Sequence, residues 1–236
     1  MDRVGRLVTV ALMAPLLFGQ RGKYSARDLF HSEAGLIVAS DAARKGRFGS
    51  ARKSTIAVTL GVKYRIWKLQ GGQAIEADPA GPFQPGDQIR LGVETNDTGY
   101  LYIVHRQPSG LWRRVFPDPE IERGNHFIRS GLTYPIPHEE GIELRQLSPG
   151  ERFFLVLSRE PVKDLEVLVG PLRPEGTVSA APPPEIPEQL VEKVRNSVNK
   201  QELATERVAP EKAVYAVNRS GKPESMVAIE VRLTAR

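Results

Sequence analysis

Apolar and polar side chains alternate regularly along the chain from residue 56. Polar residues such as Thr59, Lys63 and Arg65 fall between apolar ones at every second position. The apolar positions are Ile56, Val58, Leu60, Val62, Tyr64 and Ile66. A period of two is typical of a strand with one buried face. The two glycines at 71–72 then predict a turn.

The next segment repeats this pattern and adds two chain reversals. Residues 88–94 alternate again, and NDTG at 96–99 has the residue types that favour tight turns. Residues 100–104, YLYIV, are apolar at both parities, which predicts a strand covered on both faces. QPSG at 107–110 predicts a second reversal before a strand over 111–116. We therefore predict a three-stranded β-meander.

Further short strands are predicted at regular spacing after the meander. They fall at 126–129, 132–137, 142–145 and 151–158, and the last follows the turn signal Ser-Pro-Gly. Many short strands separated by turns favour a sandwich or barrel over a parallel sheet with crossover helices.

The C-terminal part begins with a proline-rich break at 178–189, which predicts an extended linker. Residues 187–203 then carry one apolar stripe, including Leu190 and Val194, which predicts an amphipathic helix packed on the β domain. Alternating segments at 213–218 and 225–233 predict a terminal hairpin that joins the main sheets. The predicted fold is mainly β: an antiparallel β-sandwich with one amphipathic helix inserted before the C-terminal hairpin.

The predicted domain organisation places one β-sandwich domain over 54–236, with the linker and helix as an insert at 178–205. Before it, residues 21–53 read as a flexible basic lead-in, or as a segment that attaches electrostatically to an anionic surface. Residues 1–20 read as a signal peptide, because Arg3 and Arg6 precede an apolar run too short to cross a bilayer. An amphipathic or buried N-terminal helix is the alternative. We expect an exported protein, periplasmic or extracellular, with no transmembrane segment in the mature chain.

Composition excludes several classes of chemistry. The chain of 236 residues has no cysteine, which rules out disulfides, thiolate nucleophiles, cysteine-ligated zinc and iron–sulfur clusters. It also rules out a lipid anchor on a cysteine. The net charge of +5 comes from 33 basic and 28 acidic residues that are mixed through most of the chain. Nucleic-acid binding requires a concentrated basic surface, so we do not expect it.

No motif for catalysis or for metal binding stands out. The four histidines, His31, His105, His126 and His138, have no ligand spacing, and there is neither a serine elbow nor a phosphate-binding glycine loop. We therefore predict no catalytic residues, no cofactor and no metal site, and expect that the protein is not an enzyme. An envelope hydrolase whose carboxylates are assembled by the fold is a lower-ranked alternative.

The aromatic residues of the predicted meander allow two interpretations. Tyr102 and Trp112 either fill the core or lie on an exposed sheet face, where they would stack on a sugar or peptide. In the second case Arg113 and Arg114 lie at the rim. Tyr102, Trp112, Arg113 and Arg114 are the candidate binding residues.

Several small motifs occur in an order that resembles a known bacterial family. They are FQPGDQIRLGVETNDTGYLYIV, VFP, YPIP and SPGERFFLVLSREP. Their order is similar to that of the family called domain of unknown function 4384, and the resemblance extends over about residues 55 to 170. The matching positions are Phe83, Gly86, Asp87, Arg90, Leu91, Gly99, Tyr100, Leu101, Tyr102, Phe116, Pro117, Asn125, Ile136, Pro137, Pro149, Gly150, Glu151, Ser158 and Pro161.

The resemblance implies a β-rich accessory domain. Members are found alone behind signal peptides, or attached to signalling kinases, caspase-like proteases and envelope proteins, and no catalytic residues are assigned to the family. We therefore expect an exported, non-catalytic interaction or regulatory module of the bacterial cell envelope with a protein partner. A glycan- or peptide-binding protein that uses the aromatic sheet face is the alternative.

Overall fold

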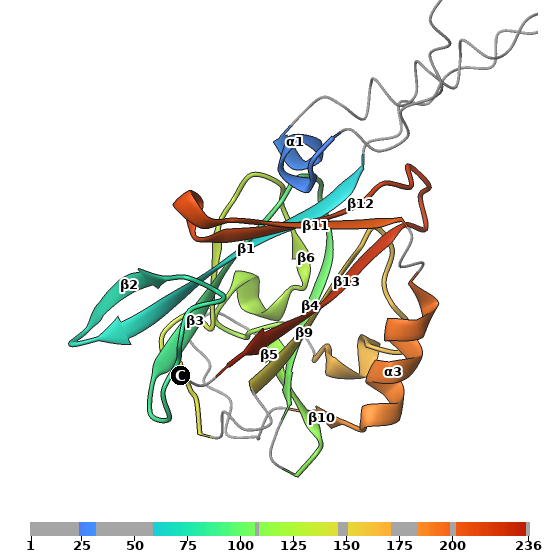
Figure 1. The fold of residues 1–236 in the computed structure, drawn as a ribbon. Coiled ribbons are helices and arrows are strands. Elements are labelled where there is room, and N and C mark those ends of the chain that lie inside the picture. Colours follow the sequence, from blue (N-terminus) through green and yellow to red (C-terminus); the bar gives the residue numbers. More distant parts are fainter. Residues whose placement is uncertain are drawn as a thin grey trace, which may run out of the picture.

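The computed structural model describes residues 24–31, 59–106, 109–145, 151–170, 184–198 and 202–234. Within these ranges two antiparallel sheets face one another as a sandwich (Figure 1). The predicted signal peptide at 1–20, the basic cluster at 44–53 and residues 178–183 of the predicted linker lie outside the described residues. The first three residues of the predicted alternating strand, 56–58, do as well.

One sheet, the β1 sheet, has β1 as its central strand. Its order is β11 (Leu203–Val208), β12 (Ala213–Asn218), β1 (Leu60–Gln70), β3 (Gln88–Thr95) and β7 (Tyr134–Ile136), with β2 (Gln73–Ala77) paired to β1 and β8 (Ile142–Glu143) paired to β3. The β4 sheet has the order β10 (Glu185–Ile186), β5 (Trp112–Phe116), β4 (Gly99–Arg106), β9 (Glu151–Ser158) and β13 (Met226–Leu233), with β6 (Phe127–Ile128) paired to β4.

Short helices cover the outer faces of the sandwich. Helix α1 (Ala26–His31) buries Leu29 and Phe30 against the β1 sheet, beside Tyr215 and Val217 of β12. Helix α3 (Glu188–Ser197) packs on the β4 sheet. The 3-10 turns are Glu122–Gly124, Glu166–Leu168 and Ala209–Glu211. None of the helices in the described ranges has the length and apolar sequence needed to cross a bilayer.

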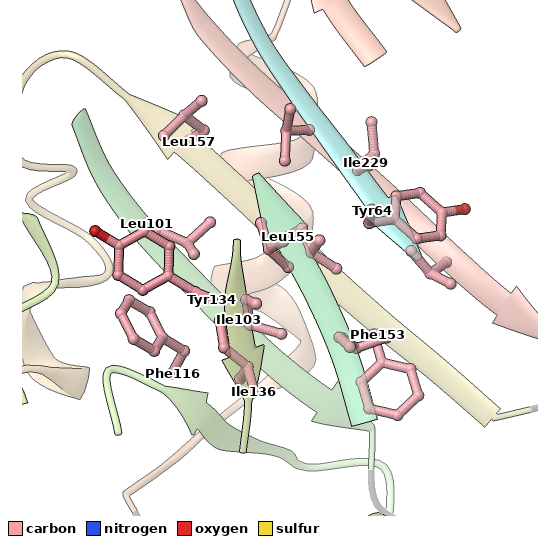
Figure 2. Close-up of a cluster of buried hydrophobic side chains, with 14 of the residues drawn as sticks. Tyr64, Leu101, Ile103, Phe116, Tyr134, Ile136, Phe153, Leu155, Leu157 and Ile229 are labelled. Atoms are coloured by element: carbon pink, nitrogen blue, oxygen red, sulfur yellow. The ribbon is translucent and has the colours of Figure 1, made fainter. Parts of the chain in front are cut away.

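Apolar side chains from both sheets fill the space between them. Figure 2 shows Leu101 and Ile103 of β4 beside Leu155 of β9, together with Tyr64 of β1 and Ile136 of β7. Alternate residues of each strand point into this core, which is the physical origin of the period of two in the sequence. The predicted mainly β sandwich with a helix before the C-terminal strands is confirmed.

The predicted meander is wrong at its first reversal, because β3 and β4 belong to different sheets. Both edges of β3 are already paired, one with β1 and the other with β7 and β8. The Asn96 side chain fastens the corner to the β1 sheet by accepting from the Gly61 N–H (2.6 Å) and donating to the Thr59 carbonyl (2.8 Å). Asp97 accepts from Arg159 (3.0 Å), which follows β9 in the β4 sheet. NDTG is therefore a bridge between the sheets. The second predicted reversal does join a pair, β4 and β5.

The C-terminal strands also differ from the predicted hairpin. Strand β12 lies between β1 and β11, so it has no free edge for β13, and β13 instead pairs with β9 in the other sheet. The buried Asn218 side chain spans the connection by donating to the Met226 carbonyl (2.8 Å). Helix α3 ends at Ser197, before the predicted end at residue 203, and Leu203 is the first residue of strand β11.

Two further elements were absent from the prediction. Strand β2 forms a hairpin with β1 through the glycine turn, where Gly71 and Gly72 both have positive φ, as a tight hairpin turn requires. Helix α1 falls within the segment 21–53 that the sequence predicted as a flexible lead-in, and its apolar side packs on the β1 sheet.

Candidate binding cleft

Of the two interpretations of Tyr102 and Trp112, core packing is confirmed and the exposed aromatic platform is wrong, because these side chains are 1% and 0% exposed. They lie on the outer face of the β4 sheet, where α3, β10 and the turn Glu166–Leu168 cover them in a second apolar cluster. The sequence pattern had assigned the helix to the β domain, but it did not show which sheet face the helix would cover.

Polar contacts fix the covering elements to these two aromatic side chains. The Trp112 Nε1–H donates to Glu188 Oε2 (2.9 Å), in the first turn of α3. The Tyr102 hydroxyl donates to the Glu166 carboxylate and accepts from the Val162 N–H (3.0 Å). Burial, and after it the bond to Glu166, raises the pKa of Tyr102 well above its usual value. Both polar tips are thus satisfied inside the protein.

Glu188 is the anchor of α3 on the sheet. Burial by itself raises the pKa of this carboxyl, but hydrogen bonds from Trp112 and Arg106 together with nearby guanidinium charge outweigh burial. The net effect lowers the pKa, so the carboxylate is the favoured form at neutral pH. A negative side chain in the first turn also interacts favourably with the helix dipole.

Arg113 and Arg114 do lie beside a concave surface. They line a cleft of about 350 Å³ at one end of the sandwich, formed by the end of β4, by β5 and by the start of β9. The remaining walls come from the loop at 117–119 and from Pro137 to Arg145, after β7. Arg113 pairs with Glu185 of β10 (3.0 Å), and the Arg114 guanidinium donates to the Leu168 carbonyl (3.0 Å).

A buried pair, His105 and Glu151, lies among the residues that line the cleft. His105 Nε2 contacts Glu151 Oε2 in a short hydrogen bond, and the imidazole stacks on Phe153 with ring centroids 4.5 Å apart. The second oxygen of Glu151 accepts from the Arg145 N–H (2.9 Å). His105 is the next-to-last residue of β4 and Glu151 is the first residue of β9, so the apolar core ends at the cleft in a polar contact.

Asp118 holds two walls of the cleft together. One carboxylate oxygen accepts from the Glu120 N–H (3.0 Å) in its own loop, and the other accepts from the His138 N–H (3.0 Å) after β7. The side chain is buried. A buried carboxylate that accepts two backbone N–H bonds fixes both loops relative to each other.

The accessible charge of the cleft is largely arginine. The side chains of Arg113 and Arg145 are 45% and 77% exposed, whereas Asp118 and Glu151 are buried. The two arginines pair with the exposed carboxylates Glu185 and Glu143. Exposed ion pairs contribute only about 0–1 kcal/mol, so an incoming carboxylate can replace either partner at little cost. Of the described residues that line the cleft, none is Ser, Thr, Cys or Lys.

The sequence prediction found two of these residues, Arg113 and Arg114, but missed His105, Asp118 and Glu151. Strand parity carries the missed signal. His105 shares the parity of the core residues Leu101 and Ile103, and Glu151 shares that of Phe153 and Leu155. A titratable residue near a strand end, at a position whose side chain points toward the core, indicates a polar contact at the edge of the core.

The four histidines are not brought together. His31 contacts the Tyr215 hydroxyl (3.2 Å), and His126 contacts Glu166 (3.2 Å). His138, however, lies with Glu120 and Glu139 in a cluster whose ligand atoms are all within 4.8 Å of one another. Linear spacing could not predict this cluster, because Glu120 comes from a different loop.

Comparison with known proteins gives one match. Residues 82–161 match the family model described as Domain of unknown function (DUF4384), which confirms the resemblance seen in the sequence motifs. The matched segment contains the strands from β3 to β9, and so all the strands that line the cleft. No curated protein and no solved structure matches the chain.

Proposed function

Since residues 82–161 of this chain match the DUF4384 family model, we propose that the protein is an exported, non-catalytic accessory module of the bacterial cell envelope. The cleft beside His105 and Glu151 binds a peptide segment of a partner protein. Two features support a binding role without catalysis: the cleft lining contains no hydroxyl or thiol nucleophile among the described residues, and its buried carboxylates are engaged by backbone N–H groups.

The exposed arginines of the cleft carry this proposal. Arg113 and Arg145 present donors that match a carboxylate, and their present partners are weakly held. Val115, Pro137 and Ile142 add apolar surface to the lining of the cleft. This combination fits an extended peptide with acidic side chains, which pair with the arginines while the peptide backbone and apolar side chains cover the prolines.

Charge reversal in the cleft tests the binding role. The double variant Arg113→Glu, Arg145→Glu is compared with Lys193→Glu, Arg232→Glu, whose side chains are also exposed and ion-paired but lie on α3 and β13. A phage-displayed random peptide library is selected on the wild-type protein, and selected peptides are measured by fluorescence polarisation. We expect acidic peptides that bind the wild type and the control but lose at least tenfold in affinity to the cleft variant. Equal binding to both variants would contradict the proposal.

Export is tested independently of the cleft. Mass spectrometry of the protein recovered from its native cells is expected to find an N-terminus between about residues 20 and 27, after removal of the basic and apolar leader. An intact Met1 in the cytoplasmic fraction would contradict export while leaving the peptide-binding role open to its own test.

A further inference from the structure

We propose that Glu120, His138 and Glu139 form a binding site for a divalent transition-metal ion, with Zn²⁺ as the ion that fits best. The three side chains come from the two loops that Asp118 joins, and each loop also contributes proline to the cleft wall. The site is separate from the peptide-binding role and does not depend on it.

The positions of the ligand atoms allow one ion to contact all three residues. One imidazole nitrogen and one oxygen of each carboxylate lie within 4.8 Å of one another. Zinc bonds of about 2.0–2.2 Å in tetrahedral geometry place ligand atoms about 3.3 Å apart. Because all three side chains are exposed, small rotamer changes bring them to this separation without moving the core.

The backbone that carries the ligands is held independently of the ligands themselves. The buried Asp118 carboxylate accepts from the Glu120 N–H and from the His138 N–H, each at 3.0 Å. The Arg90 guanidinium donates to the Glu139 carbonyl. The distance between the two loops is therefore set by groups outside the coordination sphere, as in sites where outer partners orient the ligands.

The donor set decides the class of ion. Ca²⁺ and Mg²⁺ prefer sites made wholly of oxygen, whereas imidazole with two carboxylates suits Zn²⁺ and its neighbours in the first transition series. Two carboxylates balance the charge of one divalent ion. Three protein ligands leave an open coordination position for water or for a ligand group.

Isothermal titration calorimetry with Zn²⁺ alone tests the site in the full chain. We expect one equivalent to bind the wild type, and binding to fall at least tenfold in affinity in Glu120→Gln, His138→Ala and Glu139→Gln. The matched control is Glu140→Gln, which removes an exposed carboxylate next to the site but outside the cluster, and it is expected to bind as the wild type does.

A second measurement separates positioning from ligation. Asp118→Asn removes one of the two acceptors that join the loops and is expected to weaken Zn²⁺ binding by about 10- to 100-fold while leaving one equivalent bound. Circular dichroism confirms that each variant is folded. Absence of binding to the wild type would overturn the proposal, and so would unchanged affinity in the folded His138→Ala variant, since the zinc would then be bound elsewhere on the chain.

Discussion

The two faces of strand β4 lie in different environments, although their residues alternate within one short sequence. Leu101, Ile103 and His105 point toward the core between the sheets, and the row ends at the cleft. Tyr102 and Val104 point outward, where the insert that contains α3 covers them. The outward face is thus part of a second apolar core, and the inward face carries His105, one of the residues that line the candidate binding cleft. Burial at the middle of a strand says little about chemistry at its end.

Removal of the largest outward aromatic side chain should have the largest effect. Trp112→Ala deletes a fully buried indole and its bond to Glu188, so we expect a loss of about 3–5 kcal/mol in the free energy of unfolding. Phe127→Ala, at a 40% exposed position on β6, which pairs with β4, should cost less than about 1 kcal/mol. Urea unfolding measures both. Equally small losses in the free energy of unfolding for both variants would indicate that Trp112 is exposed, as the aromatic platform requires.

Tyr64 of β1 lies in the core between the sheets, and its hydroxyl provides a test of burial there. Burial raises the pKa of Tyr64 to about 12, from 10.0 in the unfolded chain. The folded state therefore binds more protons than the unfolded state between these values, and stability falls as pH rises from about 10 to about 12. In Tyr64→Phe this part of the alkaline loss, about 2–3 kcal/mol, should disappear. Urea unfolding across this pH range would contradict the assignment if the two profiles ran parallel.

The polar end of the inner face should contribute less. Glu151→Ala removes the acceptor of the Arg145 N–H and the partner of His105, with an expected cost of about 1–3 kcal/mol. The control is Arg152→Ala, the next residue on β9, whose side chain points to the other face. Thermal unfolding compares them. A smaller loss for Glu151→Ala than for the control would show that the pair is dispensable for the fold.

The smallest expected effect is at the anchor of α3. Glu188→Gln keeps an acceptor for Trp112 but removes the charge near Arg106 and the helix N-terminus, and should cost about 1 kcal/mol near neutral pH. Because the folded pKa of Glu188 is lowered, its contribution is present above the unfolded value of 4.5 and is lost as pH falls through the folded value. The variant's acid limb should be correspondingly flatter in chemical unfolding. A steeper limb would reverse the assigned direction.

Much of the fold could be predicted from local pattern. The alternation at Leu60, Val62 and Tyr64 and the double-parity run at 100–104 correctly indicated that these segments are strands, and the run at 100–104 also indicated burial on both faces. The predicted polar face of β1 is wrong near its start, because Lys63 is buried as well. Strand pairing could not be predicted in the same way: NDTG has hairpin residues, yet its Asn96 and Asp97 fasten the corner to two different sheets. The candidate site was predicted only in Arg113 and Arg114, because the contacts of Asp118 and Glu151 join distant parts of the chain.

The sequence by itself determined which segments form strands and which side of each strand is apolar, because both follow from the local order of apolar and polar residues. The tertiary structure decided which edges pair, which outer face is covered, and which polar groups meet at the open end. Each strand has only two edges, so the partners that occupy them depend on the whole set of strands. For β3 and β12, both edges were already filled, and the next strand had to cross to the other sheet.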